Sequence, residues 1–293
     1  MSVRMLFLTE FNVFYGISLS KVCGLRIFLL PLPQFIFQDY EVRMIEICEI
    51  GELSQEKVLN QDSALKFCRL TTGYADRVVS KELTAELYSG RLTCLLGANG
   101  IGKSTLLRTL AGYQSALAGE LDEVSPETIG VVLTERIDAF GLKVREVVAL
   151  GRHPYTGYFG NLSKEDDAIV SEAMSLTHTE ALASRLFSSL SDGEKQKVMI
   201  AKALAQQTPI ILMDEPSAFL DFPSKVELML LLQKLAHEQG KAILLSTHDV
   251  GIALKMADTL WLMCDDRMVV GTTAELTDNG DIDKFLGDSR AFI

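Results

Sequence analysis

From Ala64 onward, short apolar runs alternate with longer segments in which apolar residues recur at helical spacing. This alternation is typical of an α/β domain built on a largely parallel sheet, in which the runs form strands and the periodic segments form helices. The predicted strands are Leu65–Leu70, Leu83–Tyr88, Leu92–Leu96, Ile129–Leu133, Ile210–Met213, Ala242–Leu245 and Thr259–Met263. The predicted helices are Gly102–Leu110, Ser191–Ala205, Ser224–Gln239 and Val250–Met256.

Two regions depart from regular alternation. Leu65–Leu70 and Leu83–Tyr88 precede the first long helix and predict a small antiparallel sheet. Between Val144 and Ser189 the strand pattern stops and only helical spacing remains. The sequence therefore predicts an α/β fold with a small antiparallel β subdomain and a helical subdomain at about 136–190.

Residues 1–63 have no clear period, although they contain apolar clusters. One interpretation is an N-terminal extension packed on the domain formed by residues 64–293. The other is that translation starts at Met44 and the preceding residues are not part of the protein. The apolar stretch Val22–Phe37 is shorter than the roughly 20 residues of a membrane-spanning helix and contains two prolines, so no span is predicted.

Composition narrows the function classes. The 293-residue chain is 48% hydrophobic and carries a formal net charge of −11, which argues against a nucleic-acid-binding protein. Its five cysteines are scattered, with no C-x-x-C pair, so they indicate neither a disulfide framework nor a zinc site.

A candidate phosphate-binding loop occupies Gly97–Ser104, which fits G-x-x-x-x-G-K-[ST] between a predicted strand and a predicted helix. Glycines let the backbone N–H groups turn toward phosphate, and the helix N-terminus adds positive partial charge. Lys103 would reach the β- and γ-phosphates and Ser104 would bind Mg²⁺. The alternative is a plain glycine turn, which the position after a buried strand disfavours. The candidate residues are Gly97, Ala98, Asn99, Gly100, Ile101, Gly102, Lys103, Ser104 and Thr105.

Polar side chains follow two further predicted strands. Asp214 and Glu215 come directly after Ile210–Met213, at the end of a strand where α/β sheets bind ligands. Asp214 suits a Mg²⁺ shell and Glu215 could polarise an attacking water, although an acidic pair can also be a solvated strand end. His248 follows Ala242–Leu245 and is a candidate contact to a γ-phosphate, its alternative being a structural histidine.

A helix start with two compatible interpretations lies at Ser191. The pattern S-x-x-E, completed by Glu194, predicts a capping box. The same helix start leaves a hydroxyl and the N–H of Gly193 free to meet an anion.

In this order, the phosphate loop, the Ser191 motif, the acidic strand end and the histidine resemble the nucleotide-binding domain of ABC transporters over residues 64–293. The resemblance implies a P-loop NTPase with a RecA-like core sheet that hydrolyses ATP with Mg²⁺. It also implies a head-to-tail dimer in which each ATP lies between one phosphate loop and the Ser191 motif of the other copy. By the same match, Tyr74 would stack on adenine, Glu215 would be the general base, and His248 would sense the γ-phosphate. Glu194 and Asp221 would complete the site.

The resemblance further implies permease partners, an indirect link to a substrate-binding protein, no nucleic acid, and a peripheral position at the cytoplasmic face of the membrane. Four residues depart from the family pattern. Glu135 stands where glutamine is usual and would still bind Mg²⁺, Asp192 replaces glycine, Glu194 replaces glutamine, and Ala218 replaces serine. No catalytic group is lost, so we expect an active enzyme.

The segment Val144–Tyr155 is similar to V-x-E-x-V-x-x-G-R-x-P of ABC importers for iron–siderophore complexes, haem and vitamin B12. It also fits an amphipathic helix ended by glycine and proline. We expect the aromatic loop after it, with Arg152 and Tyr155, to contact the permease; the alternative is that Tyr155 and Phe159 fold back on the insertion.

Other functions remain as alternatives. A structural ATPase of the chromosome-maintenance type needs a long coiled coil between the phosphate loop and the Ser191 motif, for which the chain has no room. A nucleotide-binding scaffold without catalysis, and an ABC transporter for another substrate, stay open.

Overall fold

The computed structural model describes residues 62–75, 77–123, 125, 127–133, 139, 141–157, 160–264 and 267–287. The expectations for residues 1–61, Glu135 and Phe159 lie outside these ranges. Within the described part of the chain, every helix is too short or too polar to cross a membrane.

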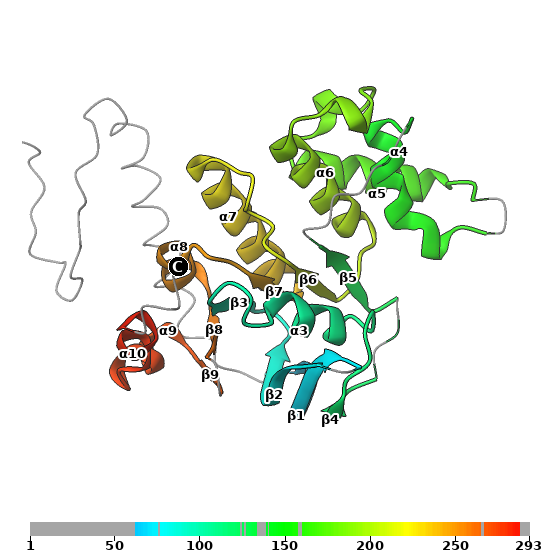
Figure 1. Cartoon of the computed structure of the whole chain (residues 1–293). Coiled ribbons are helices and arrows are strands. Elements are labelled where there is room, and N and C mark those ends of the chain that lie inside the picture. Colours follow the sequence, from blue (N-terminus) through cyan, green and yellow to red (C-terminus); the bar gives the residue numbers. More distant parts are fainter. Residues whose placement is uncertain are drawn as a thin grey trace, which may run out of the picture. The chain divides into compact units, whose positions relative to one another are not determined.

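A six-stranded sheet forms the centre of the domain, in the order β5-β6-β7-β3-β8-β9 (Figure 1). All neighbouring pairs are parallel except the last, in which β9 runs antiparallel to β8. The strands are β3 (Leu92–Gly97), β5 (Ile129–Val132), β6 (Ile210–Met213), β7 (Ala242–Ser246), β8 (Thr259–Met263) and β9 (Met268–Gly271). The predicted parallel core is thereby confirmed, and β9 is an addition that the hydrophobic pattern did not reveal.

Side-chain alternation along β3 separates two hydrophobic cores. Leu92, Cys94 and Leu96 pack with the helices α7 (Phe222–Gln239) and α8 (Val250–Met256). Leu95 faces the opposite side and packs with the helix that follows β3 and with the small sheet. Successive strand residues point to opposite faces, so a strand buried on both sides is apolar throughout.

The small sheet is antiparallel, as predicted, and has the order β2-β1-β4. Its strands are β1 (Ser63–Tyr74), β2 (Arg77–Tyr88) and β4 (Ala118–Leu121). The hairpin strands extend well beyond the apolar runs that predicted them, because paired backbone continues into their polar ends. Phe67 packs edge-on against Trp261, with ring centroids 5.6 Å apart, and joins the small sheet to the main one.

The strand-free insertion is helical, as predicted. It packs against the next helix, α6, and together they form one unit, hereafter the helical group (Figure 1). Its elements are α4 (Val144–Ala149), the 3₁₀ turn η3 (Leu150–Tyr155), α5 (Lys164–Leu176), η4 (Glu180–Leu182), η5 (Phe187–Ser189) and α6 (Asp192–Ala205). The remaining helices are α3 (Lys103–Leu110), α9 (Thr273–Asp278) and α10 (Asp281–Gly287). The helix predicted to end at the glycine and proline of Val144–Tyr155 ends at Ala149, and the glycine–proline segment continues as a 3₁₀ turn.

The expectation that Arg152 contacts a partner is wrong. Its side chain is buried, with Nε 2.8 Å from Oδ1 of Asp166, and its Nη1 donates to the carbonyl of Ala205 at 3.0 Å. The Tyr155 ring lies over the guanidinium, 4.1 Å away, and its hydroxyl donates to the carbonyl of Gln206. Tyr155 thus packs back on the helices, as the alternative held for this residue, although 46% of it stays exposed, and Arg152 joins η3 to α5 and α6.

Burial of this ion pair leads to a first prediction. Arg152→Ala leaves the Asp166 carboxylate and the Ala205 carbonyl without their partner, so the free energy of unfolding falls. The control is Arg145→Ala, since Arg145 pairs with Asp167 at the surface and contributes less than about 1 kcal/mol. Urea denaturation of both variants measures the difference. Equal losses would contradict the structural role of Arg152.

The Asp166 carboxylate gives a second prediction. Hydrogen bonds from the hydroxyl and the backbone N–H of Ser163, and then the contact with Arg152, lower the pKa of Asp166 to about 2. An unfolded aspartate titrates near pKa ~3.9, so the ionised group favours the folded state above that pH and this contribution disappears as pH falls toward about 2. Asp166→Asn should therefore destabilise the protein most at neutral pH and progressively less below about pH 4. A loss that is independent of pH would contradict this assignment.

Candidate functional site

The phosphate loop joins β3 to α3 with a backbone that requires glycine. Gly100 and Gly102 have φ of 78° and 116°, values that side chains with a Cβ rarely adopt. A Cβ at Gly102 would also lie 2.7 Å from Ser80 Oγ. Ser80 Oγ donates to the carbonyl of Ile101 at 3.4 Å, so strand β2 supports the loop from outside.

Lys103 is at the start of α3 with its side chain buried against the loop. Its Nζ donates to the carbonyls of Gly97 and Ala98 at 2.8 and 3.0 Å. Burial lowers the pKa of Lys103, and the nearby carboxylates of Glu215 and Asp214 act in the opposite direction. The ammonium group therefore lies in a site of low dielectric constant near two carboxylates. A phosphate bound by the loop would lie next to this group.

Three neighbouring strands deliver their polar residues to the same edge. The phosphate loop follows β3, Ser246 ends β7, and Asp214 follows β6. Ser246 Oγ donates to Oδ1 of Asp214 at 2.7 Å and accepts from the backbone N–H of Glu215 at 2.9 Å. Ser246 thus fixes both predicted acids. Ser246 lies between the predicted strand Ala242–Leu245 and His248, and no sequence pattern predicted its role.

Glu215 and His248 form the closest polar pair of the site. Their Oε1 and Nε2 atoms lie 2.5 Å apart, and both side chains are partly exposed. The backbone of Glu215 has φ of 48°, a strained value for a residue other than glycine. Backbone strain of this kind is often found at functional sites. The contact itself shows that the fold brings the predicted base and the predicted histidine together.

The donors for a metal ion are few. Within the described residues, no group of three or more histidine, cysteine, aspartate or glutamate side chains could hold an ion. Asp214 and the Ser104 hydroxyl supply hard oxygen atoms, which suits Mg²⁺ that keeps waters and binds phosphate oxygens. The residues present therefore fit a metal that arrives with a nucleotide. Glu135, the other predicted ligand, lies outside the described residues.

Two more predicted residues, Tyr74 and Thr105, belong to elements that contact or continue the phosphate loop. Tyr74 is at the end of β1 and half exposed, opposite Arg77 in the hairpin register. The same hairpin provides Val79 and Ser80, which touch the position of Gly102. Thr105 is buried in the first turn of α3. The hairpin therefore presents an exposed aromatic ring from the strand pair that supports the phosphate loop.

The remaining predicted residues form a second group at the start of α6 and α7. Ser191 caps α6 in the predicted capping box with Glu194, and Asp221 caps α7 by accepting from the N–H of Ser224. Hydrogen bonds from Ser224, first from its side chain and then from its backbone N–H, lower the pKa of Asp221. A Cβ at Gly193 would lie 3.1 Å from the carbonyl of Phe219, so the two helix starts adjoin. Together they line an open hollow, hereafter the signature hollow. Its lining residues are Ser191, Asp192, Gly193, Glu194, Lys197, Phe219, Leu220, Asp221 and Ser224.

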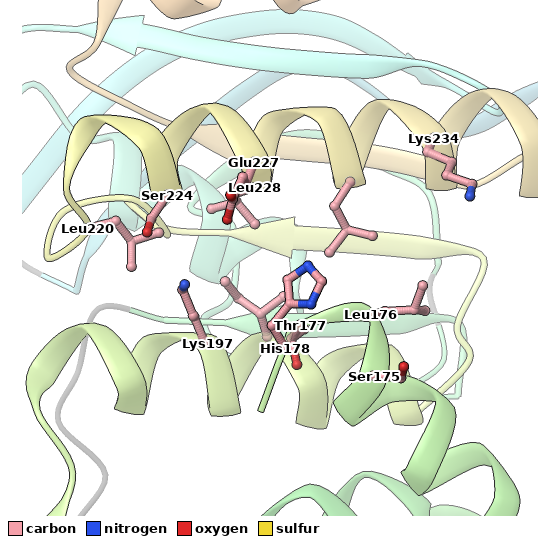
Figure 2. A pocket seen from close by; sticks show the side chains of 12 residues that line it. Ser175, Leu176, Thr177, His178, Lys197, Leu220, Ser224, Glu227, Leu228 and Lys234 are labelled. Carbon is pink, nitrogen blue, oxygen red and sulfur yellow. The ribbon is translucent and has the colours of Figure 1, made fainter. Parts of the chain in front are cut away.

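A cavity of about 280 Å³ lies beside the signature hollow, between the end of α5, α6 and α7. Figure 2 shows Lys197 on α6 and Ser224 on α7 at the same end of this cavity, near Leu220. These three residues also line the signature hollow. The two spaces therefore share one wall, behind the start of α6.

Comparison with known proteins agrees with this geometry. The family described as ABC transporter matches residues 80–218. The uncharacterised ABC transporter ATP-binding protein MJ0873 of Methanocaldococcus jannaschii is 40% identical, over 70% of this chain and 74% of its own. The iron(3+)-hydroxamate import ATP-binding protein FhuC of Bacillus subtilis is 36% identical, over 64% of this chain and 74% of its own.

Among solved structures, the dimeric bacterial ABC transporter cassette MJ0796 superposes with a TM-score of 0.65 at 25% identity, covering 71% of this chain and 98% of that one. The expected P-loop NTPase fold is thereby confirmed. The phosphate loop, two acids and a histidine at one sheet edge, together with 40% identity to a relative over 70% of this chain, lead to one assignment: this chain belongs to the ABC transporter family and is an ATP-binding, ATP-hydrolysing subunit.

Proposed function

We propose that the chain powers an ABC importer by hydrolysing Mg²⁺-ATP at a site completed by a second copy of itself. The observation that carries this proposal is the contact of Glu215 with His248 beside the buried Lys103. Lys103 and the loop N–H groups bind the β- and γ-phosphates. Asp214 and Ser104 hold Mg²⁺, which neutralises phosphate charge when bound. Glu215 accepts a proton from the attacking water, and His248 fixes the carboxylate toward it.

The signature hollow supplies the second half of the site. Ser191 and Gly193 lie at the start of a 14-residue helix, a place that favours an anion, and the Ser191 hydroxyl can reach a phosphate once it leaves its capping bond. The hollow is open to solvent, and MJ0796, the similar cassette, is a dimer in its solved structure. We place the γ-phosphate of one copy against Ser191 of the other, with Asp221 beside it and Tyr74 stacked on adenine.

The proposed transport partner is a permease contacted by the helical group. The exposed residues of α4 and η3 provide a surface for it, since Leu150, His153 and Tyr155 remain accessible after Arg152 is buried. The segment Val144–Tyr155 carries the pattern of iron-chelate, haem and vitamin B12 importers, and the similar FhuC is named for iron(3+)-hydroxamate import. We therefore propose import of a substrate of this class, with the chain peripheral at the cytoplasmic face and a substrate-binding protein on the opposite side.

Lys103→Ala tests the phosphate loop. Without the ammonium, negative charge on the phosphates is uncompensated, so ATP turnover falls by about a hundredfold or more. Lys255→Ala, which removes an exposed lysine of α8, is the matched control and should keep wild-type turnover. Phosphate release by the purified chain with its membrane subunits measures both. Turnover near wild type in Lys103→Ala would refute the assignment of the loop.

Glu215→Gln separates binding from chemistry. The amide cannot accept the proton of water, so hydrolysis falls by about 10²–10⁴-fold while ATP binding persists. ATP then holds two copies together, and size-exclusion chromatography with light scattering should show a dimer that appears only with ATP. The control is Glu238→Gln, an exposed carboxylate on α7. A chain that remains monomeric at every ATP concentration would rule out the shared site.

A further inference from the structure

The sequence predicted that the hydroxyl of Ser191 is free to meet an anion, and this is wrong, because the capping box uses it. Its Oγ donates to Oε2 of Glu194 at 2.9 Å, and the backbone N–H of Ser191 donates to the same oxygen at 2.8 Å. In return, Ser191 Oγ accepts from the N–H of Glu194 at 3.3 Å. A serine hydroxyl has one proton, so in this arrangement it has none left to offer a phosphate.

The carboxylate that takes this proton is fixed and charged. Arg185 Nη1 lies 3.1 Å from Oε1 of Glu194, and its Nη2 donates to the carbonyl of Ser189 at 3.2 Å. The hydrogen bonds from Ser191, first from its backbone and then from its hydroxyl, lower the pKa of Glu194. Arg185 therefore holds one carboxylate oxygen while Ser191 binds the other, and Glu194 stays ionised at neutral pH.

The other charged residues around Ser191 do little to offset the negative charge of Glu194. Asp192, the next residue, lies 3.9 Å from Lys195 as a partly exposed pair. Lys197 lines the signature hollow. Its positive charge also acts on Asp221 and helps to lower the pKa of that carboxylate. A phosphate that approaches Ser191 thus meets a carboxylate at the hydroxyl, with a second acid beside it.

The cost of binding follows from these contacts. To donate to a phosphate oxygen, Ser191 must give up a hydrogen bond to an ionised acceptor, and such bonds are about twice as strong as neutral ones. A glutamine at this position would keep the capping box but accept through a neutral oxygen. The identity of residue 194 therefore changes the cost of freeing Ser191 while leaving the helix start intact.

We infer that Glu194 is a positioning residue that restrains Ser191 and raises the ATP concentration at which two copies close around the nucleotide. This inference rests on the proposed function, because it needs Ser191 to meet the γ-phosphate of the other copy. It adds that the acid in this motif regulates closure and is more than a helix cap.

The chain contains a matched control. Thr272 and Glu275 form a capping box at α9 with nearly the same geometry: 2.8 Å from Thr272 N to Glu275 Oε2, 2.9 Å from Thr272 Oγ1 to Oε2, and 3.2 Å for the return bond. The signature hollow does not include it. Glu194→Gln and Glu275→Gln each convert one capping carboxylate to an amide, so a general effect on helix caps or net charge would be the same in both.

The experiment measures ATP-driven dimer formation of the full chain in a Glu215→Gln background, by light scattering over a series of ATP concentrations. Glu194→Gln should lower the concentration of half-maximal dimerisation by about fivefold or more, and Glu275→Gln should leave it unchanged. No change with Glu194→Gln, a rise, or equal shifts in the two variants would overturn the inference.

A third variant, Ser191→Ala, separates this inference from the proposed function. It should raise the ATP concentration needed, because a donor to the γ-phosphate is lost. If Ser191→Ala changes nothing, or the background variant never dimerises, the shared site itself is refuted and the restraint with it. If Ser191→Ala weakens closure while Glu194→Gln has no effect, the shared site stands and only the restraint is refuted.

Discussion

The parallel pairing of β6, β7 and β3 is the constraint on which the rest of the site depends. Parallel strands end at the same edge, so the phosphate loop, Ser246 and Asp214 meet without any long-range loop having to bring them together. Burial on both faces fixes the register of these strands, because a slip of one residue would exchange the two cores. The candidate site thus lies on a sheet edge whose register is fixed by the two hydrophobic cores.

Polar groups at that edge are arranged in a chain of dependence. Ser246 orients Asp214 and the backbone of Glu215, and Glu215 in turn meets His248. Lys103 faces the two acids from the loop and is held by loop carbonyls that a phosphate can replace. The positive charge of Lys103 is therefore opposed by the two carboxylates near it.

The helical group contains two arginine–carboxylate ion pairs and the start of α6, where the proposed second half of the site lies. Its interior contains the Arg152–Asp166 pair, and its start of α6 contains the Glu194–Arg185 pair, only the first of which is buried. The buried pair joins elements of the group, since Arg152 hydrogen-bonds to Asp166 and to the carbonyl of Ala205 away from solvent. The exposed pair lies at a surface where a nucleotide is expected. The two arginine–carboxylate pairs thus have different roles, because one is buried and the other is exposed.

The sequence by itself determined the α/β class, the five strands from Leu92 to Met263, the phosphate loop and the acids after Ile210–Met213, because buried strands and glycine turns have strong local patterns. It missed β4, β9 and the last two helices, whose short or exposed segments lack such a pattern. Only the tertiary structure decided the role of Ser246 and the burial of Arg152. Both depend on contacts between residues far apart in the chain, Ser246 with Asp214 and Arg152 with Ala205, and no local pattern encodes those distances.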